Sequence, residues 1–228
     1  MREFDALNGY PDPAQPRVVG PDIRTIQQRI VASYRDKEYY DGDRRNGYGG
    51  FKYDGRWFNV AKNMATEYGL NNKSSVLQVG CEKGFLLHDF QELFPGIKVR
   101  GTDVSRYALE HAMDGVKSYL THAPFTKLPF EDKEFDFVIG IGAIYCLNLA
   151  DAIVALKEIQ RVSRGKSFVT LASYETPEEF WMFRYWTILG TTVLKPDEWR
   201  EVMQHAGYTG DYKFTNSRTL KLILDQKS

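Results

Sequence analysis

The segment from residue 75 to residue 90 constrains the fold of this chain more than any other. A short apolar run, residues 75–79, is followed by the turn Gly80-Cys81-Glu82-Lys83-Gly84, and an amphipathic segment begins at Phe85. This pattern predicts a buried parallel strand, a tight turn, and a helix whose free N–H groups lie above the end of the strand. Glycine lets the backbone approach a ligand, so the turn is a candidate binding site. Packing alone is the alternative explanation for Gly80 and Gly84.

A second predicted strand, residues 97–103, ends in Asp103. A carboxylate at the end of the second strand of a nucleoside-binding sheet holds the ribose, because it can accept hydrogen bonds from both hydroxyl groups. Helix capping is the alternative role for Asp103. Together the turn and the acid predict a nucleoside site at the carboxyl ends of the first two strands.

Composition narrows the classes of partner. The 228 residues include 30 Lys and Arg and 30 Asp and Glu, so no global field would attract nucleic acid or an anionic membrane. Four scattered histidines lack metal-ligand spacing, and the two cysteines, Cys81 and Cys146, suggest reduced thiols. The sequence shows no signal-peptide core and no apolar run of membrane-spanning length. We expect a cytoplasmic protein with a small-molecule partner, and neither nucleic acid nor membrane as a partner.

Aromatic residues gather in two parts of the chain, residues 34–57 and 180–186. This clustering predicts a cleft lined by aromatic rings. The first cluster contains the glycine-rich segment 46–55, which we interpret as a lid whose tyrosines cover a ligand. A flexible linker is the alternative.

The other segments alternate between helix and strand patterns. Residues 1–20 predict an irregular arm with no core of its own, and a helix is expected from Pro21 to Tyr40. Further helices are expected at residues 57–68, 85–90, 106–112, 149–162, 177–189 and 196–204, and further strands at 116–121, 135–141 and 166–172. Residues 212–215 and 220–224 are expected to form an antiparallel pair. The alternation predicts an α/β fold with a doubly wound sheet.

These features resemble the class I S-adenosylmethionine-dependent methyltransferases. The resemblance covers roughly residues 57–227 and is carried by residues 76–84, Asp103, residues 128–130 with the strand behind them, and the order of elements. It implies a Rossmann-like sheet of seven strands with the last strand antiparallel, and S-adenosyl-L-methionine as cofactor. We expect a methyltransferase domain over residues 57–228, preceded by a cap of arm, helix and lid over residues 1–56. Residues 46–57 and 206–212 are similar to a bacterial branch associated with surface-polysaccharide or capsule biosynthesis.

The resemblance also implies site residues. The residues expected to bind the cofactor are Tyr48, Arg56, Trp57, Gly80, Cys81, Glu82, Gly84, Asp103, Val104, His122, Ala123 and Gly140. Arg56 and Trp57 would clamp the cofactor carboxylate, and His122 would lie near the adenine amino group, although an exposed loop histidine is the alternative. Phe125 would stack on the base or fill the core. Arg184 would suit an anionic acceptor or lie on a solvated face.

Two residues are expected to be catalytic. Tyr145 follows the fourth strand, where relatives place residues that face the transferred methyl group, so its hydroxyl would orient the acceptor; a core role is the alternative. Glu175 follows the fifth strand and would serve as a base, with capping of the next helix as the alternative.

The turn departs from the family pattern at two positions. Gln78 stands where an acid is common, which removes an ion pair with the cofactor's ammonium group. Glu82 stands where a glycine is common, so its side chain would obstruct the methionine part, repel its carboxylate, or bind its ammonium group. A histidine usual near Tyr145 is also missing.

We therefore expect methyl transfer to an oxygen or nitrogen atom of a small polar acceptor, namely a sugar, a sugar nucleotide or a capsule precursor. The alternative is a catalytically impaired relative that binds a nucleoside ligand or a partner enzyme. A nicotinamide-dependent enzyme is disfavoured, because a full G-x-G-x-x-G motif is missing after the first strand.

Overall fold

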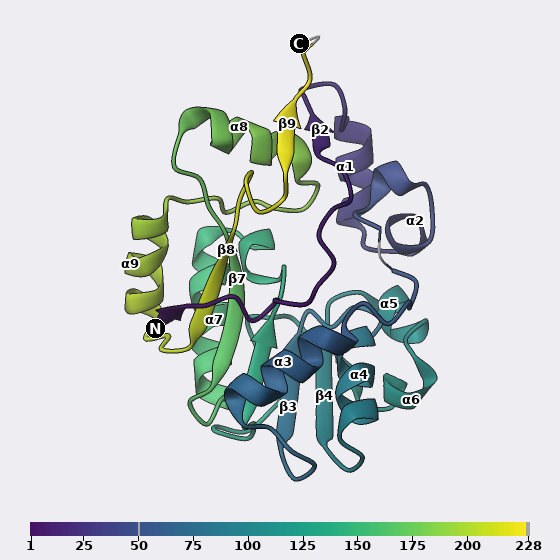
Figure 1. Ribbon diagram of the computed structural model, residues 1–228, viewed down its shortest axis with the longest axis vertical. Coiled ribbons are helices and arrows are strands. Elements are labelled where there is room, and N and C mark those ends of the chain that lie inside the picture. The colour runs from purple at the N-terminus through teal and green to yellow at the C-terminus, as the bar shows by residue number, and fades with distance from the viewer. Residues whose placement is uncertain (50, 227–228) are drawn as a thin grey trace.

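A seven-stranded parallel sheet forms the centre of the computed structural model, which describes residues 1–49 and 51–226. Gly50 of the predicted lid and Lys227 at the end of the family resemblance lie outside the described residues. The sheet order is β1-β8-β7-β6-β3-β4-β5 (Figure 1). Its strands are β1 (Arg2–Glu3), β3 (Ser75–Val79), β4 (Lys98–Asp103), β5 (Leu120–His122), β6 (Phe137–Gly140), β7 (Ser167–Ala172) and β8 (Asp211–Thr215).

The predicted antiparallel last strand is wrong. β8 lies beside β7 in parallel register, with Phe168 opposite Asp211 and Ala172 opposite Thr215. A helical crossover leads into β8, and such a connection returns the chain in the same direction. The chain then turns out of the sheet through a turn at Asn216, whose side chain accepts from the N–H groups of Arg218 and Thr219. Strand β9 (Leu222–Leu224) therefore pairs with β2 (Arg17–Val19), also in parallel, as a separate small sheet.

Without β1, the strand order follows the doubly wound pattern in which the chain first moves to one side of the first strand and then to the other. The point of reversal lies between β3 and β6, which are direct neighbours. Ligands of such sheets bind beyond the carboxyl ends of the strands at this point. The observed topology thus places a site above β3 and β6.

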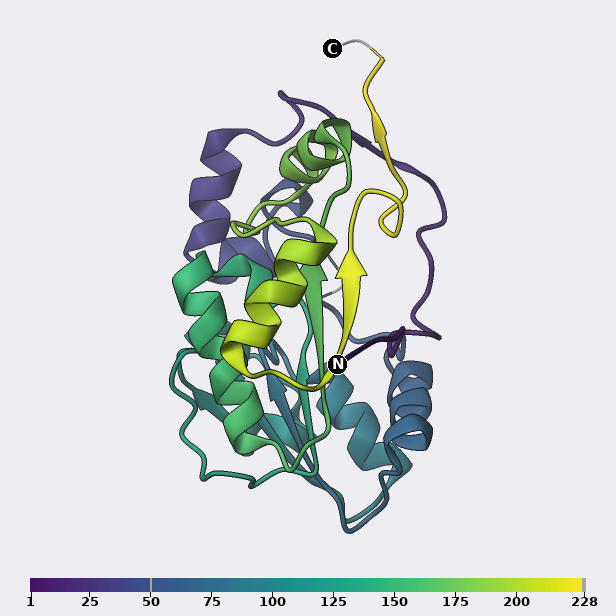
Figure 2. The same cartoon turned by 90° about the vertical axis from the view of Figure 1, so that its left-hand side faces the viewer.

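Helices cover both faces of the sheet (Figure 2). One face packs against α3 (Phe58–Tyr68) and α4 (Phe85–Leu93), and the other against α7 (Leu149–Val162) and α9 (Pro196–Ala206). These helices begin and end close to the predicted residues because their signals are local: Gly69 and Gly207 end α3 and α9 in the left-handed conformation. Two short helices, α5 (Arg106–Glu110) and α6 (Asp114–Lys117), follow β4.

The prediction of a strand over residues 116–121 is wrong at its start. Residues 114–117 form α6, and β5 begins only at Leu120. Val116 is fully buried, and it packs where a Cβ on Gly84 would lie. Its apolar character thus reflects packing under the turn after β3 and not a place in the sheet.

The predicted helix from Pro21 to Tyr40 is two helices. α1 (Ile26–Ser33) begins at a capping box formed by Thr25 and Gln28, and α2 (Lys37–Tyr40) begins at Asp36. Arg35 lies between them with φ of 49°, a left-handed conformation that no helix can continue through. The chain therefore changes direction at Arg35.

The expectation that residues 1–20 form an irregular arm is wrong in part, because the arm contains β1 and β2. Its residue Ala6 packs into the core of the main sheet and not into a core of the arm. β1 extends the main sheet beside β8, and Ala6 and Val19 are buried. From β1 the arm runs to the small sheet at the far end of the molecule (Figures 1 and 2).

A cap covers the carboxyl ends of the main strands (Figure 1). It comprises α1, α2, the 3-10 helix η1 (Arg44–Asn46), α8 (Pro177–Trp186) and the small sheet. Tyr48 follows η1 and connects this N-terminal part of the cap to the segment after α8. Its hydroxyl accepts from the N–H groups of Ile188 at 2.8 Å and Leu189 at 3.1 Å. Within the described ranges, no helix combines the length and apolar character needed to cross a membrane.

Candidate functional site

A cavity of about 420 Å³ lies between the cap and the carboxyl ends of the central strands. We call it the central cavity. Its walls include the turn after β3, the tip of β4, the 3-10 helix η2 (Ile144–Cys146) after β6, and residues 5–13 of the arm. Its volume falls in the range usual for small-molecule sites. It occupies the place that the strand order assigns to a ligand.

The turn after β3 opens toward this cavity. The N–H groups of Gly80 and Cys81 both donate to the carbonyl oxygen of Thr102, at 2.8 and 3.0 Å, which bends the chain sharply toward β4. Gly80 has φ of 75° and lines the cavity. Gly84 has φ of 77°, and a Cβ there would lie 2.7 Å from Val116 Cγ2. A Cβ on Gly80 would lie 3.0 Å from the Ala143 Cβ, so packing favours glycine at both positions, and Gly80 in addition brings the backbone of the turn to the cavity wall.

Asp103 lies at the tip of β4 and lines the cavity. One carboxylate oxygen accepts from the Glu82 N–H at 2.9 Å, and the other accepts from the Ser105 N–H at 2.8 Å. Burial raises the pKa of Asp103, and these two donors oppose the shift. Each oxygen keeps a free acceptor site, because a carboxylate has about four lone-pair positions. Asp103 thus fixes the turn and can still accept from a ligand.

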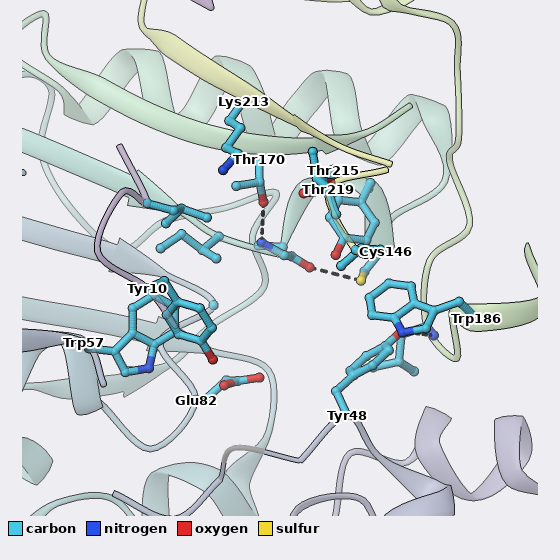
Figure 3. Close-up of a pocket in the computed structure, with 18 of the residues that line it drawn as sticks. Tyr10, Tyr48, Trp57, Glu82, Cys146, Thr170, Trp186, Lys213, Thr215 and Thr219 are labelled. Atoms are coloured by element: carbon cyan, nitrogen blue, oxygen red, sulfur yellow. Dashed lines mark hydrogen bonds between the residues drawn. The ribbon is translucent and has the colours of Figure 1, made fainter. Parts of the chain in front are cut away.

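Glu82 extends into the central cavity (Figure 3). Its backbone has φ of 50°, an unusual conformation for a side chain of this size. Glu82 is an exposed residue, and its side chain lies in the cavity between the arm, η2 and the turn after β3. Desolvation by these cavity walls, together with the negative charge of Asp103, raises the pKa of Glu82 to about 8. At pH 7 its carboxyl group is therefore mostly neutral.

Two aromatic pairs face each other across the cavity (Figure 3). Tyr10 and Trp57 pack with ring centroids 4.6 Å apart, and Tyr48 and Trp186 with centroids 5.0 Å apart. The predicted aromatic-lined cleft is thus present, and the two clusters in the sequence meet in it. Such walls suit flat or apolar parts of a ligand.

A polar wall lies beyond Glu82 (Figure 3). Gly142 donates its N–H to the Thr170 hydroxyl at 2.8 Å, and its carbonyl oxygen accepts from the Cys146 thiol at 3.0 Å. Burial raises the pKa of the Cys146 thiol to about 11, so it stays protonated. Tyr145 also lines the cavity, and burial raises the pKa of its hydroxyl well above the usual value.

The structure brings together only part of the predicted set. Tyr48, Trp57, Gly80, Glu82, Asp103 and Tyr145 line the central cavity, as does Phe125, which also belongs to the core. Cys81 is buried against Gly101, and a Cβ on Gly140 would touch Ile159 and Val169, so both positions pack in the interior. Val104 and Ala123 follow β4 and β5 outside the wall, and Val104 contacts exposed His122 through its carbonyl oxygen.

Three predicted charged residues lie away from the central cavity. Arg56 forms an ion pair with Asp54 in an adjoining cavity. Glu175 is exposed and pairs with Arg218 at 2.8 Å, while the cap of α8 is Thr176. Arg184 donates to the carbonyl oxygen of Gly190 at 2.9 Å. Tyr145 and Glu175 are thus not neighbours in one site.

Other wall residues had no signal in the sequence. Tyr10 and Arg17 come from the arm, Arg35 from the break between α1 and α2, and Thr170 and Lys213 from strand interiors. Their local patterns give no reason to single them out. Only the pairing of β2 with β9 and the bend at Arg35 bring the first three to the cavity. Thr170 and Lys213 could be assigned to the cavity wall only if the register of the sheet were already known.

Comparison with known proteins connects this geometry to an enzyme class. Residues 76–166, which include β3, β4, β5 and β6, match a family described as "Methyltransferase domain". These residues carry the turn, Asp103 and Tyr145. The chain is also 32% identical over 143 residues to a protein of Staphylococcus aureus named demethylmenaquinone methyltransferase. That match covers 59% of this chain and 56% of the relative, so the chain spans about half the length of the curated relatives it matches.

Solved structures agree on the fold. The YcgJ protein of Bacillus subtilis matches with a TM-score of 0.54 and 16% identity, over 64% of this chain and 66% of that chain. BH2331 of Bacillus halodurans matches with a TM-score of 0.53 and 16% identity, over 64% of this chain and 68% of that chain. The matched domain and the solved structures together support a methyltransferase-domain fold, for which the sequence predicts S-adenosylmethionine as cofactor.

The residues present fit this cofactor in three respects. Gly80 brings the backbone of the turn to the cavity wall, Asp103 has free acceptor positions, and the cavity has a suitable volume. In addition, Gln78 Oε1 is buried at the end of β3 without a hydrogen-bond partner among the described residues. A buried acceptor of this kind calls for a donor, but Gln78 is not among the residues that line the central cavity.

Proposed function

We propose that this chain transfers a methyl group from S-adenosyl-L-methionine to a small polar acceptor in the central cavity. The observation that carries the proposal is the joint placement of Gly80 and Asp103 at the carboxyl ends of β3 and β4, next to the switch point and beside one cavity of about 420 Å³. The matched domain covers the same residues. We further propose that residues 57–228 form the catalytic domain, that residues 1–56 contribute β1 to its sheet and the N-terminal part of its cap, and that the protein is cytoplasmic, consistent with two free cysteines.

The cofactor supplies a methyl group activated by a positively charged sulfur atom. Asp103 would hold the ribose hydroxyls, and the backbone at Gly80 would allow the methionine part to pass the turn. Glu82 is mostly neutral at pH 7 because its pKa is raised to about 8, so it would not repel the methionine carboxylate. The departure from glycine at this position is therefore compatible with binding.

Tyr145 would orient the acceptor. Its raised pKa keeps the phenol protonated at neutral pH, so it would act through hydrogen bonding and not as a base. The proposed acceptor is a sugar, a sugar nucleotide or a capsule precursor with an oxygen or nitrogen nucleophile. This choice rests on residues 46–57 and 206–212 alone. The curated relatives are named demethylmenaquinone methyltransferase, so a quinone is the alternative acceptor to test beside the sugars.

Titration calorimetry with S-adenosylhomocysteine tests the proposal. We expect saturable one-to-one binding by the wild-type chain, and methyl transfer to one acceptor class when labelled S-adenosylmethionine is supplied with nucleotide sugars or demethylmenaquinone. A chain that unfolds cooperatively but binds no S-adenosylhomocysteine would contradict the proposal.

A second candidate is a catalytically impaired relative that binds a nucleoside or a partner enzyme. Glu82, whose side chain occupies part of the cavity, favours it. Binding of S-adenosylhomocysteine by Glu82→Gly but not by the wild-type chain would support this candidate.

A further inference from the structure

A second cavity, of about 680 Å³, adjoins the central cavity beneath the cap. We call it the arginine chamber, because its wall includes Arg17, Arg24, Arg44 and Arg56. The two cavities share the wall formed by residues 10–13, Arg17, Tyr48, Trp186 and Leu220. The chamber is therefore a direct neighbour of the central cavity.

Positive charge in the chamber exceeds negative charge. The chamber wall contains the carboxylates of Asp12 and Asp54, and each already has a cationic partner: Lys221 lies 2.9 Å from Asp12, and Arg56 pairs with Asp54. Across residues 1–49 and 51–226, no ion pair joins Arg17, Arg24 or Arg44 to a carboxylate. These three guanidinium groups leave the chamber with uncompensated charge.

Arg17 and Arg24 are partly buried, whereas Arg44 is exposed at the mouth of the chamber. Arg24 lies over the Tyr48 ring at 5.3 Å, and its Nη1 is buried without a hydrogen-bond partner in the described part of the chain. Burial and the nearby charges of Arg44 and Arg29 lower the pKa of Arg24 to about 10. Burial and Arg44 likewise lower the pKa of Arg17. Arg17 and Arg44 each donate to a backbone carbonyl oxygen, of Leu220 and Gly47 respectively. Within the part of the chain that the structure describes, Arg24 Nη1 is thus the buried donor without a partner, and an anion beside it would stabilise the three like charges.

We propose that the arginine chamber binds a phosphate or diphosphate group carried by the methyl acceptor. A carboxylate brings one negative charge, whereas three guanidinium groups match the two or three charges of a phosphate or diphosphate. The guanidinium fork also fits phosphate oxygens two at a time. The shared wall places the remainder of the acceptor in the central cavity. This inference rests on the proposed function, because it defines the acceptor of that same site.

Calorimetry with inorganic pyrophosphate tests the inference at low ionic strength, with inorganic phosphate and acetate as further probes. For the wild-type chain we expect affinity to decrease in the order pyrophosphate, phosphate, acetate. Arg24→Gln and Arg44→Gln should each weaken pyrophosphate binding at least tenfold. Arg45→Gln is the matched control, since Arg45 belongs to the same 3-10 helix but pairs with Asp43 outside the chamber. It should bind as the wild type does.

S-adenosylhomocysteine, titrated separately, distinguishes this inference from the proposed function. If each folded variant binds it normally while pyrophosphate binding is lost, the inference is supported. If pyrophosphate binds equally to the wild type, Arg24→Gln and Arg44→Gln, or no better than acetate, the inference is wrong although the proposed function stands. Loss of S-adenosylhomocysteine binding by the wild type would instead refute the proposed function. Circular dichroism verifies that the variants fold.

Discussion

At the scale of single residues, Asp103 and Glu82 are coupled. The Glu82 N–H donates to Asp103, and the Asp103 charge helps raise the pKa of Glu82. The position of Asp103 at the tip of β4 was predictable, because an acid at the end of a predicted strand is a local sequence signal. The protonation state of Glu82 could not be predicted, because its raised pKa depends on cavity walls that distant segments such as the arm and η2 contribute.

Asp103→Asn should weaken binding of S-adenosylhomocysteine about 10- to 100-fold. Loss of a hydrogen bond to a charged group costs about 1.5–3 kcal/mol, and each 1.4 kcal/mol is about a tenfold change in affinity. Asp136→Asn is the control, because Asp136 also accepts from a backbone N–H, that of Ser75, but at the opposite end of the sheet. Calorimetry measures both. Equal affinities in the two variants would remove Asp103 from the binding site.

Glu82→Gln should alter how stability depends on pH. The folded-state pKa of Glu82 is raised to about 8 from an ordinary value of 4.5, so the native protein holds a proton that the unfolded chain releases. This contribution to stability is fully present below pH 4.5 and is lost as the pH rises through 8. The variant should therefore match the wild type at pH 4 and unfold at a higher temperature than the wild type at pH 9.

Thermal unfolding monitored by circular dichroism measures this difference. Glu175→Gln is the control, since Glu175 lies on the surface in an ion pair with Arg218. It should show no gain in relative stability with pH. A Glu82→Gln effect that is the same at both pH values would mean that the carboxyl group does not titrate as inferred.

At the scale of elements, prediction succeeded where the signal was local. α7 has the predicted bounds, Leu149–Val162, because Asn148 caps it and its apolar positions repeat at helical spacing. Strand direction and edge pairing were not predictable. Residues 211–215 and 222–224 have ordinary strand patterns, and only the crossover before β8 and the turn after it decide their partners.

Gly84→Ala tests the element formed by β3, the turn and α4. It should destabilise the protein by about 1–3 kcal/mol, because alanine is strained at φ of 77° and its Cβ would lie 2.7 Å from Val116 Cγ2. Gly207→Ala is the matched control. It has φ of 68° at the end of α9 but nothing within 4 Å of an added Cβ.

The difference in unfolding free energy between these two variants therefore isolates the clash. In a Val116→Ala background, Gly84→Ala should cost only about as much as Gly207→Ala. Urea denaturation measures the wild type and the four variants Gly84→Ala, Gly207→Ala, Val116→Ala and the double variant. If Gly84→Ala lowers the unfolding free energy as much in the Val116→Ala background as in the wild type, its effect comes from backbone strain alone and not from the clash with Val116.

At the scale of the whole molecule, the arm and the C-terminal segment together close the site. β2 pairs with β9, and the Asp225 N–H donates to the carbonyl oxygen of Val19 at 2.9 Å. Residues 10–13 and Leu220, which precede these strands, line both cavities. The sequence could not predict this closure, because contacts between positions about 200 residues apart leave no local pattern.

Val19→Asp should open this closure. Val19 is only 3% exposed, so an aspartate there would place a charge among apolar neighbours and separate β2 from β9. Val18→Asp is the matched control, because Val18 is 50% exposed and points to the opposite face of the same strand. We expect Val19→Asp to be cleaved within residues 6–20 by a protease at least tenfold faster than the control.

The same variant should bind S-adenosylhomocysteine more weakly, because Tyr10 and its neighbours would leave the wall of the central cavity. Its main thermal transition should nevertheless remain cooperative, because the seven-stranded sheet and its two helical layers do not depend on the small sheet for their core. If Val19→Asp and Val18→Asp are cleaved at equal rates and bind equally well, the small sheet does not hold the arm over the site, and the walls contributed by the arm are not needed for binding.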